Sequence, residues 1–390
     1  MENNLLDAFI KLSREMFGPD SIPLHRPIFE GNERRYLVEC IDSNFVSSVG
    51  KRVEEFEDRV ADFTGANYAV AMVNGTSALH VAIKLAGVQP GDEVISQALT
   101  FIATCNAITY AGAVPVFIDV DLDTMGMSPA ALKRFLKENA LKKENGVFNA
   151  KTGKRISACI PMHTFGIPCR IEEILSICEE WGIALIEDAA ESLGSYYGGR
   201  HTGTFGEMSA LSFNGNKIIT TGGGGMLLTN DSSLALQAKH ISTTAKVSHP
   251  YEFDHDEVGF NYRMPNLNAT LGCAQMERLS ELLSAKEDLA FKWANFFDEY
   301  GIQFAKAIPG TTSNHWLNAI TLKDKSERNN FLKFTNRNGV MTRPIWKLIS
   351  RLPMFEGCQN DGLPNSMWLE ERVVNIPSSV PDGALKEFHY

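Results

Sequence analysis

Lys217 is the residue whose surroundings in this sequence point most directly to chemistry. It follows the apolar segment Ser209–Phe213 and precedes four consecutive glycines, Gly222 to Gly225. Lysine usually stays solvated, so burial here would lower its pKa and leave more of the neutral amine that attacks an aldehyde. The glycines would let backbone approach a ligand closely. The rival interpretation, a phosphate-binding P-loop, requires glycines before the lysine in a GxxxxGKS/T pattern, which does not occur.

Asp188 and Glu191 follow a second apolar segment, 183–186, that is typical of a buried strand. This pattern places Asp188 at the carboxyl edge of a sheet. A buried carboxylate there needs a cation as partner, and a protonated pyridine nitrogen would supply one while staying charged as an electron sink. The alternative is an aspartate that caps the N-terminus of a helix after the strand.

Three further sites lie at predicted strand ends. Thr76 and Ser77 begin a helix after a short strand, where hydroxyls and backbone N–H groups would bind an anion, although an ordinary helix cap has the same pattern. Phe101 could stack on a flat heterocycle or simply pack in the core. His163 also ends a strand, a position where histidine is more often structural than functional.

An anion site, a stacking ring, a carboxylate and a buried lysine are the parts that a pyridoxal 5'-phosphate site requires. All of them lie at predicted carboxyl ends of strands in one part of the chain. The sequence therefore predicts a pyridoxal phosphate enzyme, and it predicts no metal site.

The elements that position these residues alternate between strand and helix from about residue 52. Such alternation predicts an α/β fold with a mostly parallel sheet between two layers of helices, with functional residues at the carboxyl ends of the strands. Strands are expected within 69–73, 91–99, 115–120, 156–163, 183–188, 208–213 and 225–231, and helices at 53–63, 77–85, 103–110 and 171–182, with a polar insertion at 142–155.

The pattern changes after about residue 250. Residues 264–300 predict a long helix that is broken at most once, and 315–322, 340–346 and 372–377 predict strands of a smaller α/β domain. We expect a large cofactor-binding domain with its N-terminal segment at 1–260, and the linking helix and small domain at 261–390.

Composition narrows the class of protein. The net charge is −10 and no basic stripe occurs, which argues against a nucleic-acid partner. The seven cysteines are scattered without a CxxC pair, as in a protein of the reducing cytoplasm. The first 18 residues predict an amphipathic helix and not a signal peptide. No stretch reaches the ~20 apolar residues of a membrane span, so we expect a soluble, cytoplasmic protein.

The segments EDAAESLGSYYGGRHTGTFG and LSFNGNKIITTGGGGML resemble the signature of the DegT/DnrJ/EryC1/StrS sugar aminotransferases, as do NGTSALHVA, TFIATCNAI and GFNYRMPNLNATLG. The resemblance covers most of the chain and implies the aspartate-aminotransferase-like fold, fold type I of pyridoxal phosphate enzymes. It implies that Lys217 forms the Schiff base with the cofactor, that Asp188 pairs with the pyridine nitrogen and that Phe101 stacks on the ring.

The same resemblance implies the remaining cofactor contacts. Thr76, Ser77 and Ser212 match phosphate ligands, and Asn261 matches an asparagine that reaches the phosphate of the neighbouring subunit, so a homodimer with shared active sites is expected. Glu191 occupies a position near the cofactor where the family often has His or Gln.

The resemblance also implies a reaction. Members with histidine in place of Lys217 are sugar dehydratases, so the lysine implies transamination from L-glutamate, through pyridoxamine 5'-phosphate, to a nucleotide-linked 4-keto sugar. The segments ESLGSYYGGRHTGTFG and TRPIWKL look most like enzymes that aminate UDP-4-keto-6-deoxy-N-acetylhexosamine for bacterial surface polysaccharides. Candidate substrate contacts are His163, Arg263, His315, Arg343 and Trp346. The alternatives are a pyridoxal-phosphate-dependent sugar dehydratase or racemase, and a non-catalytic regulator that binds a sugar nucleotide.

Overall fold

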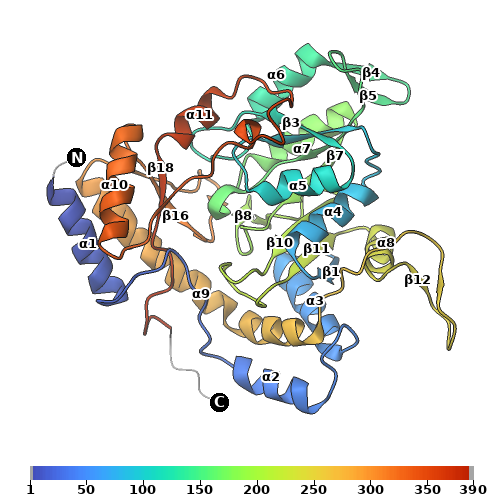
Figure 1. The fold of residues 1–390 in the computed structure, drawn as a ribbon, viewed down its shortest axis with the longest axis horizontal. Coiled ribbons are helices and arrows are strands. Elements are labelled where there is room, and N and C mark those ends of the chain that lie inside the picture. The colour runs from blue at the N-terminus through green and yellow to red at the C-terminus, as the bar shows by residue number, and fades with distance from the viewer. Residues whose placement is uncertain (1–2, 386–390) are drawn as a thin grey trace.

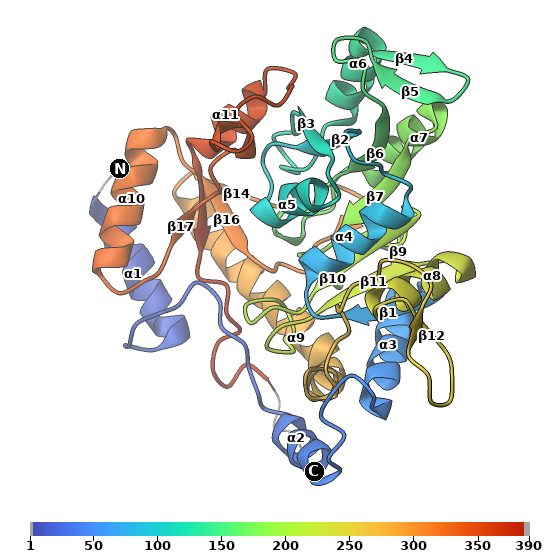
Figure 2. The same ribbon diagram turned by 45° about the vertical axis from the view of Figure 1, so that its right-hand side comes forward.

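The structure is a computed structural model, and it describes residues 3–385. The chain forms a larger and a smaller sheet that are joined by one long helix, and Figures 1 and 2 show the two sheets side by side. No helix within 3–385 combines the length and the apolar character that a membrane crossing requires.

The larger sheet has the strand order β1-β11-β10-β7-β6-β2-β3. Within it, β11 runs antiparallel to both neighbours and the other six strands run parallel. Each strand that the sequence predicts for this sheet is confirmed. Their bounds are β1 (Tyr68–Met72), β2 (Glu93–Gln97), β3 (Val114–Ile118), β6 (Ile156–Ile160), β7 (Ala184–Asp188), β10 (Met208–Ser212) and β11 (Gly225–Thr229).

Helices cover both faces of this sheet, because the strand side chains alternate between two apolar layers. Val70 and Met72 of β1 pack in the layer of α4, α5 and α8, whereas Ala71 packs in the opposite layer with α3 and α9. The expected mostly parallel sheet between helices is therefore confirmed. The helices around it are α3 (Lys51–Thr64), α4 (Gly75–Leu85), α5 (Ile102–Tyr110), α6 (Pro129–Asn139), α7 (Ile171–Trp181) and α8 (Ser232–Ser242).

The smaller sheet is antiparallel, with the order β14-β16-β18-β17. Helix α9 (Asn266–Glu299) leads to it as one unbroken helix of 34 residues, so the break that the sequence allowed is absent. The predicted strands are present but shorter than expected. The elements here are β14 (Gln303–Phe304), β16 (Asn318–Thr321), β17 (Arg343–Pro344), β18 (Val373–Ile376), α10 (Lys325–Arg337) and α11 (Pro364–Glu370).

Helix α1 (Asn3–Phe17) confirms the predicted amphipathic helix. Its buried Phe9 stacks on Trp293 of α9 at a ring-centroid distance of 5.2 Å and also contacts Phe331 of α10. The N-terminal helix thus packs beside the smaller sheet, although it precedes the larger one in sequence (Figure 1). The division of the chain into two domains at residue 260 stays a prediction.

Several small elements were not predicted. The polar insertion at 142–155 contributes to a hairpin, β4 (Ala140–Lys143) with β5 (Gly146–Asn149), and β12 (Lys246–Val247) with β13 (Asp254–His255) forms an arm that projects from the body in Figures 1 and 2. Also unpredicted are α2 (Glu33–Asp42), β8 (Tyr196–Tyr197), β9 (Arg200–His201), β15 (Thr311–Thr312) and two 3-10 turns, Thr164–Gly166 and Ile349–Arg351. The same is true of α6, α8, α10, α11 and β14, whose bounds are given above.

Phe56 holds α3 and α9 against the end of β10. Its ring is fully buried and meets the ring of Phe213 edge-on, with centroids 4.9 Å apart. On its other side lies Gly272 of α9, where an added Cβ would come within 2.7 Å of the Phe56 ring. The close approach of α9 to α3 therefore depends on glycine at 272 and on a large ring at 56.

We predict that Phe56→Ala lowers the free energy of unfolding by about 3–5 kcal/mol, because the ring leaves a cavity that its neighbours cannot fill. Urea denaturation followed by circular dichroism measures this change. Phe291→Ala on the exposed side of α9, where the side chain is 67% exposed, should change stability by less than about 0.5 kcal/mol. Equal effects of the two substitutions would contradict this role of Phe56.

Candidate active site

A cavity of about 690 Å³ lies at the carboxyl edge of the larger sheet and is closed on one side by residues of the smaller sheet. It gathers side chains that are more than 100 residues apart in sequence. Eight of the residues predicted from sequence line it: Thr76, Phe101, Asp188, Glu191, Ser212, Lys217, Arg343 and Trp346.

Lys217 enters this cavity from the loop between β10 and β11. Its side chain is 13% exposed, and Nζ lies 3.7 Å from Oε1 of Glu191 and 3.8 Å from the centroid of the Trp316 ring. Burial lowers the pKa of Lys217, while Glu191 and Asp188 oppose that shift. This environment favours the neutral amine that can attack a carbonyl carbon.

Asp188 ends β7 and points into the same cavity. Its Oδ2 accepts a hydrogen bond of 2.6 Å from Thr104 Oγ1, and its Oδ1 accepts one of 3.2 Å from the Ala190 N–H. No helix begins here, so the helix-cap interpretation of Asp188 is wrong. Within residues 3–385 the carboxylate forms no ion pair, and burial raises its pKa. A protonated ring nitrogen would supply the missing cation.

The first turn of α4 and the end of β10 form the anion side of the cavity. Asn74 caps α4 by accepting a hydrogen bond from the Ser77 N–H at 2.8 Å. Gly75 lies so close to β10 that an added Cβ would be 3.1 Å from Ser212 Cβ. The hydroxyls of Thr76 and Ser212 thus border one helix N-terminus, where N–H groups favour a phosphate.

Phe101 lies just before α5, with 49% of its surface exposed although it lines the cavity. Its ring centroid lies 6.4 Å from that of Trp346, which also contacts Phe165 at 4.9 Å. An exposed aromatic face beside Asp188 and Lys217 can stack on a planar ring. Together with the anion site, these groups fit pyridoxal phosphate.

Two predicted substrate contacts, both histidines, lie outside the cavity. His163 does not line the cavity. Its ring is fully buried and both nitrogens are engaged: Nε2 lies 3.0 Å from Glu187 Oε2, and Nδ1 accepts from the Cys169 N–H at 3.2 Å. His315 does not line the cavity, although its neighbour Trp316 does. Burial lowers the pKa of His315 to about 4.

Three predicted residues lie outside the cavity formed by this chain. The Ser77 side chain is buried in α4, and its backbone N–H is used by the Asn74 cap. Asn261 is exposed on the segment that follows the β12–β13 arm, and Arg263 lines a separate hollow of about 680 Å³ together with Lys239. A contact from Asn261 to the phosphate would require a second subunit, so this role stays a prediction.

Several cavity residues were not singled out from sequence, among them Trp316, Lys347 and Asn375. The Trp316 ring packs against the Lys217 ammonium group, and its Nε1 donates to Asn216 O at 2.6 Å. Asn375 of β18 lines the cavity at 3% exposure, and its Nδ2 has no hydrogen-bond partner within the described chain. Asn375 of β18 pairs with Arg343 of β17. The two residues are 32 positions apart in sequence, so no local pattern predicts this contact.

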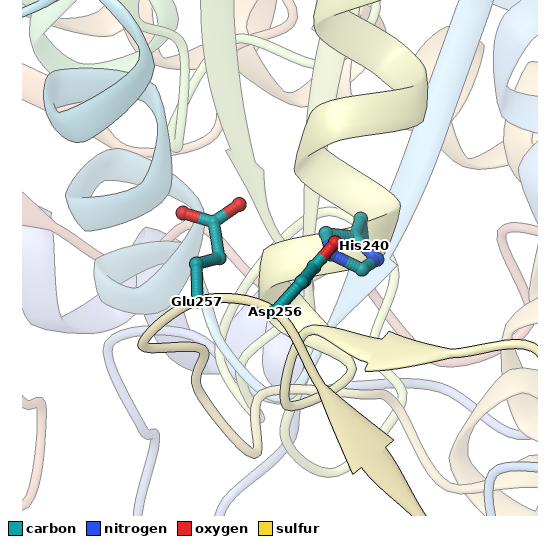
Figure 3. A group of neighbouring side chains, drawn as sticks. All are labelled: His240, Asp256 and Glu257. Carbon is teal, nitrogen blue, oxygen red and sulfur yellow. The ribbon is translucent and has the colours of Figure 1, made fainter.

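One group of potential metal ligands lies apart from the cavity, at the end of α8. Figure 3 shows His240, Asp256 and Glu257, with the Asp256 carboxylate turned toward the histidine ring. His240 Nε2 already contacts Asp256 Oδ1 at 2.7 Å, and the two carboxylates are exposed. The histidine nitrogen is thus already bonded to one of the carboxylates, and exposed acidic groups of this kind are common without a metal.

Comparisons with known proteins agree with this chemistry. The model of the DegT/DnrJ/EryC1/StrS aminotransferase family matches residues 27–382. The chain is 38% identical over 336 residues to the putative pyridoxal phosphate-dependent aminotransferase EpsN of Bacillus subtilis, covering 86% of this chain and 84% of that protein. It is 35% identical to the GDP-perosamine synthase of Vibrio cholerae, over 94% of this chain and 96% of that protein. The aminotransferase TlmJ of Streptoalloteichus hindustanus superimposes with a TM-score of 0.83 at 26% identity, over 92% and 93% of the chains.

We predict that Asp188→Asn retains bound cofactor but slows its reaction with an amino acid at least about 100-fold. Asparagine can still accept the Thr104 hydrogen bond, but it carries no charge to keep a ring nitrogen protonated. Stopped-flow absorbance of the cofactor measures the rate. The matched control is Asp256→Asn on the surface, which should leave the rate unchanged. An Asp188→Asn variant with the normal rate would show that another group supports the ring.

Proposed function

Because the chain belongs to the DegT/DnrJ/EryC1/StrS aminotransferase family, whose cofactor is pyridoxal 5'-phosphate, we propose that it aminates a sugar nucleotide. In this proposal the amino group comes from L-glutamate and goes to the 4-keto group of a nucleotide-linked 6-deoxy sugar. The product would be an amino sugar for a bacterial surface polysaccharide or glycan.

The observation that carries the proposal is the pairing of Lys217 with Asp188 in one cavity. The lysine is largely buried and its pKa is lowered, and the aspartate forms no ion pair among residues 3–385. A dehydratase of the kind considered from sequence would lack the lysine. A non-catalytic regulator would have no need for a desolvated amine.

When bound, the cofactor supplies an aldehyde that takes up the amino group and a ring that withdraws electrons. The Lys217 amine would tether it and then move a proton from the α-carbon of glutamate. The same Nζ would return a proton to the sugar carbon that receives the amine. Asp188 would hold the ring nitrogen protonated, and Phe101 and Trp346 would exclude water from the ring face.

The cavity also suits an anionic second substrate. Arg343 and Lys347 line it from the side of the smaller sheet, next to Trp346. Arg343 Nη1 is held by Asn336 Oδ1 and Thr342 O, each at 2.9 Å, which leaves the rest of its guanidinium for a ligand. Two cations beside an indole fit a pyrophosphate attached to a base or sugar.

For the nucleotide sugar we propose UDP-4-keto-6-deoxy-N-acetylhexosamine, on the resemblance of TRPIWKL and ESLGSYYGGRHTGTFG described above. A second candidate is a GDP-linked keto sugar, because GDP-perosamine synthases of three bacteria are 34–35% identical to this chain. We further propose a cytoplasmic homodimer in which Asn261 of each subunit completes the phosphate site of the other.

Lys217→Ala should lower turnover at least about 100-fold, because both the tether and the proton carrier are lost. Release of 2-oxoglutarate from glutamate in the presence of a 4-keto sugar nucleotide measures turnover, and absorbance after dialysis measures the tethered cofactor. Lys292→Ala, on the exposed side of α9, is the matched control. Full turnover by Lys217→Ala would overturn the assignment.

The identity of the substrate is tested by supplying UDP-linked and GDP-linked 4-keto-6-deoxy sugars separately and identifying the products by mass spectrometry. We expect the UDP-linked N-acetylhexosamine to be aminated at least about tenfold faster, which corresponds to about 1.4 kcal/mol in the transition state. Faster amination of the GDP-linked sugar would replace our first candidate with the second. If glutamate bleaches the cofactor but no sugar nucleotide restores it, the acceptor class is wrong.

A further inference from the structure

We propose that Glu191 shares one proton with Lys217 and thereby sets how much of the lysine is free amine. Glu191 is then a positioning residue, which acts through the lysine. This inference rests on the proposed function for its purpose, but the pair itself exists in the protein without cofactor and can be tested there.

The Glu191 side chain is fixed with one oxygen free. Its Oε2 accepts a hydrogen bond of 2.8 Å from the Phe165 N–H, and its carbonyl accepts from Asn314 Nδ2 at 2.9 Å. The side chain is only 2% exposed, and Oε1 faces Lys217 Nζ at 3.7 Å. Backbone and side chain are thus both anchored, so the free oxygen is held toward the amine.

The other carboxylate of the cavity is less available to the lysine. Both oxygens of Asp188 already accept hydrogen bonds, from Thr104 and from Ala190. The Lys217 Nζ also lies 3.8 Å from the centroid of the Trp316 ring, which stabilises an ammonium but cannot take a proton. Glu191 is therefore the proton acceptor that Lys217 faces within the described chain.

The remaining titratable groups near the pair are few. His25 lies in the segment before α2, and burial lowers its pKa. The positive charges of Lys286, from α9, and of Lys217 lower the pKa of His25 further. His163 acts on Asp188 from the other side of β7 but is held by Glu187. None of these three makes an ion pair or hydrogen bond with Glu191 in residues 3–385.

Burial brings the two protonation states of the pair closer in energy than they would be in water. It raises the pKa of Glu191 to about 7 and lowers that of Lys217, because both charged forms lose hydration. An ammonium beside a carboxylate and an amine beside a carboxylic acid then differ by one proton transfer, with no change in net charge. Two such groups titrate as a unit.

This exchange matches what the proposed reaction asks of Lys217. The amine must give up a proton before Nζ bonds to a carbon, and it needs a proton again when it is released. Glu191 Oε1 would accept that proton and return it, so the cavity need not exchange a proton with water. The cavity charge would stay constant through both steps.

Glu191→Gln tests the proposal, because the amide oxygen still accepts the Phe165 hydrogen bond but the side chain cannot carry the shared proton. The full chain, freed of cofactor, is treated briefly with acetic anhydride over a range of pH. Peptide mass spectrometry then gives the acetylation rate of each lysine, which follows its fraction of neutral amine.

In the unmodified chain, we expect the acetylation rate of Lys217 to rise with pH in two steps. In Glu191→Gln it should rise in a single step, with a midpoint about one pH unit or more lower. The sign follows from charge: a nearby carboxylate favours the ammonium, so its removal lowers the lysine pKa. At a pH between the two midpoints, Lys217 of the variant should acetylate several-fold faster.

Lys286 is an internal control in the same samples. It is 1% exposed and thus more buried than Lys217. Burial lowers its pKa to about 7, but its Nζ donates to the carbonyls of Trp316 and Ser378 and to no carboxylate within residues 3–385. Its profile should be the same in both proteins. A Lys217 profile that does not move would overturn the proposal, and so would an equal shift at Lys286, which would indicate a general structural change.

The holoenzyme gives a second readout. The pH profile of the reaction with glutamate should shift to lower pH in Glu191→Gln by the amount seen for acetylation, whereas a purely structural role would lower the rate equally at every pH. If the unmodified enzyme does not react with glutamate at any pH, the proposed function fails while the acetylation result still decides the role of Glu191.

Discussion

Three ionisable side chains share one cavity, and the rest of the site depends on how their charges balance. Lys217 faces two carboxylates, and burial opposes the charged form of all three. A buried charge without a partner of opposite sign would raise the free energy of the folded state. The two carboxylates differ in their hydrogen bonds. Both oxygens of Asp188 accept hydrogen bonds, from Thr104 and Ala190, whereas one oxygen of Glu191 faces the lysine. Asp188 is thereby available to a cation of the ligand, and Glu191 to the amine of Lys217.

This balance requires a backbone that brings three strand ends together. Strands β10, β7 and β1 run in the same direction, so their carboxyl ends lie at one edge of the sheet. Strand β11 follows Lys217 and runs antiparallel between β1 and β10. Gly225 lies so close to Asn74 that an added Cβ would be 2.4 Å from its carbonyl oxygen. The glycine run after the lysine therefore serves close packing of β11 against the α4 cap, more than the contact with a ligand that the sequence suggested.

Much of the fold and the cofactor side of the cavity could be predicted from sequence, because their signals are local. Strands such as 184–188 are short apolar runs, and their polar ends fall at one edge once the order is parallel. The remainder depends on contacts between distant segments. Trp316 lies against Lys217 and Asn375 beside Arg343 only after α9 has brought the smaller sheet into place. The same holds for His163, which follows β6 in sequence as a site residue would but contacts Glu187 of β7 and does not line the cavity.

The two sheets divide the work of the cavity. Residues expected to hold the cofactor come from the larger sheet and its loops, whereas Arg343, Trp346, Lys347 and Asn375 come from the smaller one. The Asn375 amide is buried with Nδ2 unpaired, and such a donor is costly unless a ligand acceptor reaches it. Because α9 is a single helix packed on α3 through Phe56 and Gly272, and on α1 through Trp293 and Phe9, it sets the spacing of the two halves. Changes on the smaller sheet can therefore alter which acceptor fits while the charge balance around Lys217 is preserved.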